Sequence, residues 1–130
     1  MTTLAEVAAF LAERAEAAGA AGVARENISV DPGIGFGKTL EHNLALIAGL
    51  PTLAALGYPV VFGASRKRFL RAIDPAAVDT DDRLGGSIAA ALAAADRGAA
   101  VIRVHDVRET VQALKVWAAL EWPHPSTSSG

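Results

Sequence analysis

The stretch Ile28-Ser-Val-Asp-Pro-Gly-Ile-Gly-Phe-Gly-Lys-Thr39 decides the fold of this chain. It begins with the short run 28–31, whose β-branched residues Ile28 and Val30 are typical of a β-strand and which ends at Pro32. A glycine-rich loop over 33–37 comes next, and Leu40 opens a segment with apolar residues at helical spacing. A strand that leads through a loop into a helix is the repeating unit of α/β proteins.

The same unit occurs twice more along the chain. The apolar run Val60–Phe62 leads into Gly63-Ala-Ser65, and a helix is expected to begin at Arg66. The run Val101–Val104 precedes a final helix that Asp106 caps. Three apolar strands, each followed by a helix, predict a parallel sheet covered by helices.

Two further helices complete the pattern. Thr3 and Glu6 form a capping box that opens a helix at the N-terminus of the sequence. An alanine-rich helix begins near Leu84, and its interior glycines Gly85 and Gly86 indicate close packing on a neighbour.

Composition narrows the functional class. The chain has 130 residues, a net charge of -2 and no cysteine, which predicts one domain without a disulfide framework or a thiolate zinc site. The mildly acidic balance argues against nucleic-acid or anionic-membrane partners. The apolar run Ile88–Ala95 is far shorter than the ~20 residues of a membrane span, and Glu6 and Glu13 interrupt any signal-peptide pattern. We therefore expect a cytoplasmic protein, with one unit over 1–122 and a disordered tail over 123–130.

Polar residues follow each predicted strand, where parallel α/β proteins build their ligand sites. Asp31 follows the first strand, Ser65-Arg66-Lys67 follows the second, and Arg103 and His105 close the third. Arg103 and His105 are two positions apart on one predicted strand, so both side chains should point to the same face. Together with Lys67 they predict an anion site, with Asp31 beside it as an acceptor.

Other interpretations of these residues remain open at this point. Arg103 and Asp31 could form a purely structural ion pair, and His105 could be a turn residue. Gly37-Lys38-Thr39 resembles the end of a phosphate-binding P-loop, although Pro32 stands at the leading glycine position. His42 and His124 have no partners at ligand spacing, so a transition-metal site made by this chain alone is not expected.

Several motifs together resemble the C-terminal half of the dihydropteroate synthases, a pterin-binding family. They are, in order, Asp31-Pro-Gly-Ile-Gly-Phe-Gly-Lys-Thr39, His42-Asn43-Leu44, Gly63-Ala-Ser-Arg-Lys67 and Ile102-Arg-Val-His-Asp-Val107. The resemblance implies a TIM (β/α)8 barrel, to which this chain would contribute strands six to eight with their helices. It also implies condensation of 6-hydroxymethyl-7,8-dihydropterin diphosphate with p-aminobenzoate, which yields dihydropteroate and diphosphate for folate synthesis and is the step that sulfonamides block. A related barrel family transfers methyl groups from methyl-folates, but the motifs around Lys67 and Arg103 favour the synthases.

The resemblance also implies a role for each matching residue. Catalysis would rest on Lys67, Arg103 and His105. The pterin would contact Asp31, Gly63 and Lys67, and the diphosphate would contact Arg103 and His105. The p-aminobenzoate would contact Gly35, Phe36, Ser65, Arg66 and Arg68, the last of which stands where several family members have serine.

Cofactors and partners follow from the same resemblance. Magnesium is implied, with its ligands expected in the N-terminal part of the family barrel, which this chain lacks. The expected partners are the two small-molecule substrates and either a second copy or a complementing N-terminal half. Since a typical (β/α)8 barrel needs ~250 residues, the alternative is a non-catalytic half-barrel that self-associates through its unpaired edges.

Overall fold

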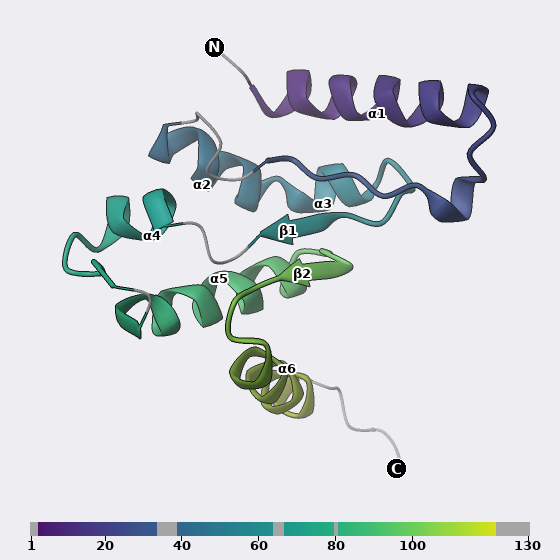
Figure 1. Cartoon of the computed structure of the whole chain (residues 1–130). Coiled ribbons are helices and arrows are strands. Elements are labelled where there is room, and N and C mark those ends of the chain that lie inside the picture. Colours follow the sequence, from purple (N-terminus) through teal and green to yellow (C-terminus); the bar gives the residue numbers. More distant parts are fainter. Residues whose placement is uncertain (1–2, 34–38, 64–66, 80, 122–130) are drawn as a thin grey trace.

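The computed structural model describes residues 3–33, 39–63, 67–79 and 81–121. Six helices, two short strands and two 3-10 turns follow one another in this part of the chain (Figure 1). In order, the elements are α1 (Leu4–Ala20), η1 (Arg25–Asn27), α2 (Leu40–Ala48), α3 (Leu50–Ala54), β1 (Val61–Gly63), α4 (Lys67–Ile73), η2 (Asp81–Arg83), α5 (Leu84–Asp96), β2 (Val101–Arg103) and α6 (Val107–Glu121). The predicted tail at 123–130 lies outside the described residues.

Helix α1 begins with the predicted capping box. The Thr3 amide donates to Glu6 Oε1 at 2.8 Å, and the Glu6 amide donates to Thr3 Oγ1 at 3.1 Å. The hydrogen bond with the Thr3 backbone, followed by the one with its side chain, lowers the pKa of Glu6. The buried face of α1 carries Val7, Leu11 and Ala15, at the spacing that an amphipathic helix requires. The capping-box prediction is confirmed.

The sheet is parallel, as the sequence predicts, but shorter. β1 pairs with β2 in the register Val61 to Val101 and Gly63 to Arg103. The predicted strand 28–31 is reduced to one parallel bridge between Val30 and Val60, where the Val61 amide donates to the Val30 carbonyl at 2.7 Å. This segment has a strand neighbour on one side only in the described part of the chain, and Pro32 cannot donate a ladder hydrogen bond.

The third predicted strand, β2, is more exposed than β1. Val101 and Arg103 of β2 are exposed and Ile102 is half-buried, whereas Phe62 of β1 is fully buried. Among the described elements β2 pairs only with β1, so it lies at the edge of the sheet. An edge strand with one uncovered face leaves its side chains in solvent.

The helices pack beside the strands and supply most of the core residues. α5 packs against β2 and α6, while α2 packs against α4 (Figure 1). A Cβ built on Gly86 would meet Leu70 Cδ2 at 3.2 Å, but one on Gly85 would meet nothing within 4 Å. The predicted close packing of α5 is therefore confirmed at Gly86 and wrong at Gly85. Within the described segments, no helix has both the length and the apolar character to cross a membrane.

The starts of the first two strand segments are joined by Arg25. Its guanidinium lies 4.3 Å from the centre of the Tyr58 ring, donates to Tyr58 Oη at 3.1 Å and donates to the Gly57 carbonyl at 3.3 Å. Because parallel strands share one direction, this cluster lies at the end of the sheet opposite to the polar residues that follow the strands.

Candidate functional site

Three predicted site residues lie at the carboxyl end of the sheet, where the parallel strands terminate. Asp31 directly follows the bridge residue Val30, Gly63 ends β1, and Arg103 ends β2 opposite Gly63. Because the strands are parallel, their carboxyl ends meet at this edge. The structure therefore brings together residues that are 72 positions apart in the sequence.

The Asp31 carboxylate is held on both of its oxygens. Oδ1 accepts from the Gly33 amide at 2.8 Å, and Oδ2 accepts from Arg103 Nη2 at 3.2 Å. The first contact is an Asx-turn, in which an aspartate side chain bonds the backbone two residues on. Gly33 has a φ of 74°, a left-handed conformation that favours glycine. The loop that follows the strand thus begins in a defined geometry.

The contact between Arg103 and Asp31 is the ion pair that the sequence left open as a structural alternative. Their side chains are 54% and 33% exposed, respectively. Exposed ion pairs contribute only about 0–1 kcal/mol to stability. The pair therefore exists, but it does little to stabilise the fold.

His105 does not lie on the strand. β2 ends at Arg103 and α6 begins at Val107, so His105 belongs to the exposed connection between them. The prediction that His105 lies on the strand is therefore wrong. The alternation of burial nevertheless continues past Arg103, since Val104 is half-buried and His105 is exposed like Arg103. Pairing with β1 is lost after Arg103 because β1 itself ends at Gly63, the opposite residue in the register.

The remaining predicted residues follow β1 or belong to the glycine loop. Lys67 is the first described residue of α4, and the expected helix start at Arg66 lies outside the described residues. Arg68 is exposed on α4 and lines a shallow hollow with Arg71, Ala72 and Pro75. Four predicted contacts for p-aminobenzoate lie outside the described residues: Gly35, Phe36, Ser65 and Arg66.

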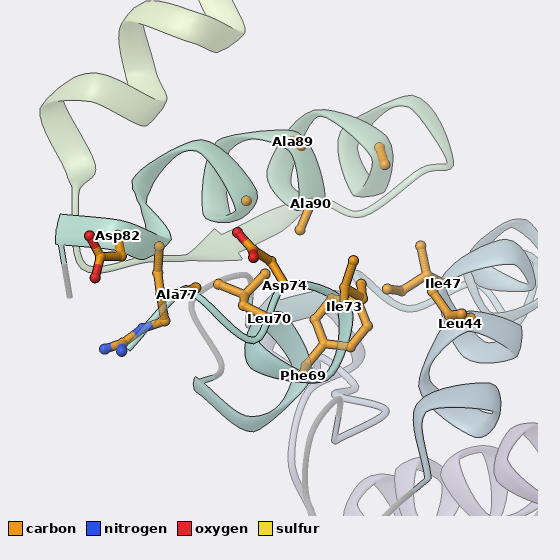
Figure 2. Close-up of a pocket in the computed structure, with 13 residues that line it drawn as sticks. Leu44, Ile47, Phe69, Leu70, Ile73, Asp74, Ala77, Asp82, Ala89 and Ala90 are labelled. Carbon is orange, nitrogen blue, oxygen red and sulfur yellow. The ribbon is translucent and has the colours of Figure 1, made fainter. Parts of the chain in front are cut away.

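An apolar pocket of about 320 Å³ lies elsewhere, between α2, α4 and α5. Figure 2 shows Leu44 and Ile47 on one side of it, Phe69, Leu70 and Ile73 on another, and Ala90 across from them. Asp74 and Asp82 also line it, and none of the predicted site residues does. Sequence reasoning missed this pocket, although the apolar positions 69, 70 and 73 at helical spacing were a signal for a buried face.

Possible metal ligands do not gather at the described part of this site. Among the described residues, no cluster of three or more His, Cys, Asp or Glu side chains could hold an ion.

The hydroxyl of Thr39, the last residue of the P-loop-like stretch, accepts from the His42 amide at 3.2 Å and caps α2. Gly37 and Lys38 of that stretch lie outside the described residues.

Comparison with known proteins identifies the family. The model of the family described as "Pterin binding enzyme" matches residues 1–105. The chain belongs to this family. The resemblance seen in the sequence motifs is thereby confirmed.

Relatives within the pterin-binding family are dihydropteroate synthases. The chain is 50% identical over 116 residues to the enzyme of Neisseria meningitidis serogroup C. This match covers 88% of this chain and 41% of that protein. It superposes with a TM-score of 0.86 and 47% identity on the Xanthomonas albilineans enzyme in complex with 7,8-dihydropteroate, over 92% of this chain and 45% of that one. The Thermus thermophilus enzyme in complex with 4-aminobenzoate is 49% identical, with a TM-score of 0.82, over 89% of this chain and 46% of that one.

These likenesses identify the fold as part of a TIM barrel, which confirms the fold class predicted from the sequence. The chain spans less than half the length of each of these three relatives. In a pterin-binding barrel, ligand sites lie at the carboxyl ends of the strands. Asp31, Gly63 and Arg103 are at that end, and the apolar pocket lies among the helices outside the strands.

Proposed function

We propose that this chain is the C-terminal part of a dihydropteroate synthase. The reaction joins 6-hydroxymethyl-7,8-dihydropterin diphosphate to p-aminobenzoate and releases diphosphate. The observation that carries the proposal is the meeting of Asp31, Gly63 and Arg103 at the carboxyl edge of the sheet, in a chain that is 50% identical to a dihydropteroate synthase over 116 residues.

The pterin ring would be held by Asp31, Lys67 and the Gly63 backbone. An ionised carboxylate is an acceptor only, so it suits the paired N–H donors of the amino-pyrimidine edge. Gly63 has no side chain to obstruct a flat ring near the end of β1. Lys67, at the start of α4, would donate to the ring and lie near the entering amine.

The diphosphate would be held by Arg103 and His105. A guanidinium offers a planar fork of donors that matches phosphate oxygens. As the C–O bond to the methylene carbon breaks, negative charge grows on the departing diphosphate, and the amine of p-aminobenzoate forms the new C–N bond and then loses a proton. Fixed cationic donors stabilise this charge, and losing one commonly costs about 3 kcal/mol in the barrier.

The p-aminobenzoate would lie against the glycine loop and the start of α4. Phe36, between Gly35 and Gly37, would pack on the ring, while Ser65, Arg66 and Arg68 would receive the carboxylate. Support comes from the exposed position of Arg68 on α4 and from the 4-aminobenzoate bound to the Thermus thermophilus enzyme, a relative of 49% identity.

Magnesium would assist by neutralising diphosphate charge. The described residues do not form a set of ligands for it, so we assign no step of the reaction to the metal through this chain. Its ligands are expected in the N-terminal part of the family barrel.

A cytoplasmic location is part of the same proposal, and it is compatible with a chain that carries no cysteine for disulfide formation in an oxidising compartment.

The proposed macromolecular partner is an N-terminal half-barrel, or a second copy of this chain. Support comes from the exposed apolar residues of β2 and α6, among them Val101, Val107, Val116 and Leu120, the last of which is 76% exposed. Contiguous exposed apolar surface marks an interaction site, and in the proposal these residues would contribute to one. It equally favours the second candidate function, a non-catalytic half-barrel that self-associates, for which sedimentation of the isolated chain should reveal dimers or larger species.

A chimeric barrel tests the proposed activity. This chain replaces the matching 116-residue segment of the Neisseria meningitidis enzyme, and dihydropteroate formation is measured with both substrates. We expect turnover in the chimera, and a loss of about 10²–10³-fold in kcat/KM when Lys67→Ala removes one positioned donor.

Arg97→Ala is the matched control, because Arg97 donates to the Ala93 carbonyl of its own helix and has no part in the proposed site. It should leave kcat/KM near the chimera's value. A chimera with the circular dichroism and thermal transition of the parent enzyme but no dihydropteroate formation would contradict the proposed function and leave the self-associating half-barrel.

A further inference from the structure

We infer that Arg103 occupies the pterin-binding carboxylate of Asp31 when no substrate is present, and that diphosphate releases it. This inference rests on the proposed function and adds a specificity device to it. The device would favour the diphosphorylated pterin over a pterin that lacks the diphosphate.

Both oxygens of the Asp31 carboxylate are engaged by this chain's own donors. Gly33 holds Oδ1 at 2.8 Å and Arg103 holds Oδ2 at 3.2 Å. The Gly33 contact is made within the loop and can persist when a ligand binds. The Arg103 contact comes from another strand and stands where an incoming ring would place its donors.

The guanidinium of Arg103 and the edge of a pterin are chemically alike. The amino-pyrimidine edge is guanidine-like, because one carbon carries an amino group between two ring nitrogens. The Arg103 guanidinium presents the same planar pattern of N–H donors, and carboxylates accept both in the same way. Arg103 therefore acts as an internal substitute for the substrate's edge.

The ion pair is weak enough for a substrate to displace it. Side chains that are 54% and 33% exposed form a pair that contributes little free energy, because solvent screens the two charges. A diphosphate offers Arg103 a stronger bidentate partner than one carboxylate oxygen. Binding of the anion should then strengthen binding of the ring, and linkage requires the reverse effect to be equal.

The first test uses the 130-residue chain and needs neither pterin binding nor activity. The amide resonance of Gly33 reports on the Asp31 carboxylate, to which it is hydrogen-bonded. We expect it to shift when inorganic diphosphate is added and to shift in the same direction in Arg103→Gln without diphosphate. Arg97→Gln, which removes an arginine outside the site, should leave the Gly33 resonance in place. A Gly33 resonance that responds neither to diphosphate nor to Arg103→Gln would overturn the inference.

The second test measures the coupling in the chimeric barrel. Free pterin, which has the edge but no diphosphate, should bind about two- to fivefold more tightly when inorganic diphosphate is present, the range that an exposed ion pair allows. In Arg103→Gln, pterin should bind as tightly without diphosphate as with it. A chimera that is active but shows no such coupling would overturn the inference and leave the proposed function standing. A chimera that shows the coupling but forms no dihydropteroate would contradict the proposed function and support the inference about Arg103.

Discussion

The apolar pocket and the polar edge of the sheet differ in how each is assembled. The pocket is enclosed by α2, α4 and α5, which are close together in the sequence, and its described lining is apolar except for a few charged residues. The polar edge instead joins Asp31 to Arg103, 72 positions away, and exposes both side chains. Helix packing of neighbours can be completed within a short chain, whereas a barrel's ligand site needs strand ends from around the whole ring. Stability and chemistry should therefore depend on different residues.

Enlarging the pocket should give the largest loss of stability. Phe69 is nearly fully buried and lines it, so Phe69→Ala should lower the free energy of unfolding by about 3–5 kcal/mol through lost burial and a cavity. Urea denaturation measures the loss. Leu44→Ala is the control, because Leu44 lines the same pocket but is 46% exposed, and it should cost less than about 1.5 kcal/mol. Equal losses for the two variants would mean that the pocket is not part of the core.

Truncating Arg103 tests the other side of the comparison. Arg103→Ala in the chimeric barrel should lower kcat/KM by about 10²–10³-fold, since it removes a donor to the departing diphosphate. The same change should alter the free energy of unfolding by no more than about 1 kcal/mol, because the pair with Asp31 is exposed. A large loss of stability with unchanged kcat/KM would reverse the division of roles between the two regions.

The two glycines in the first turn of α5, Gly85 and Gly86, give a matched pair of smaller changes. Gly85→Ala should stabilise the chain by less than about 1 kcal/mol, since alanine favours a helix and its Cβ would meet nothing within 4 Å. Gly86→Ala should gain less, because its Cβ would meet Leu70 Cδ2 at 3.2 Å. Leu70 and Gly86 both line the pocket, so thermal denaturation of the two variants reports how far Leu70 can move into it. A larger gain at Gly86 than at Gly85 would contradict the close contact.

The smallest expected effect concerns α1, which lies outside both regions. The pKa of Glu6 is lowered in the folded chain from its ordinary value of 4.5. Its contribution to stability is therefore fully present above that value and is lost as the pH falls through the lower pKa of the folded state. Urea denaturation at pH 7 and at pH 3 should show this loss in the native sequence and a smaller one in Glu6→Gln, which keeps a capping side chain without a titrating carboxyl. Glu13→Gln, the same change elsewhere on α1, should retain the pH dependence of the native sequence.

Much of the fold could be predicted because the signals are local. The capping box at Thr3 needs only residues one turn apart, and the helices follow from apolar spacing. The extents of the strands could not be predicted in the same way. Val30 forms a single bridge and β2 is exposed, because strand length depends on how many neighbours are present, which a strand's own residues do not encode.

The site could also be predicted only in part, because its residues are local signals but the extents of the strands that carry them are not. Asp31, Gly63 and Arg103 were expected at the ends of parallel strands, and they lie there. His105 was expected on the strand, but the register with β1 ends two residues before it. The functional roles of these residues, and those of Lys67, Phe36 and Ser65, remain predictions from the family resemblance.

The amino-acid sequence alone indicated the order of the main helices and strand segments, although not helix α3, and it predicted the parallel class of the sheet and the residue types at each strand end. Only the tertiary structure decided that Arg103 reaches the Asp31 carboxylate, that β2 is an exposed edge, and that three helices enclose an apolar pocket. Each of these depends on which segments pack against one another, and that is set by packing energy summed over the whole molecule, which the residues of one segment do not encode.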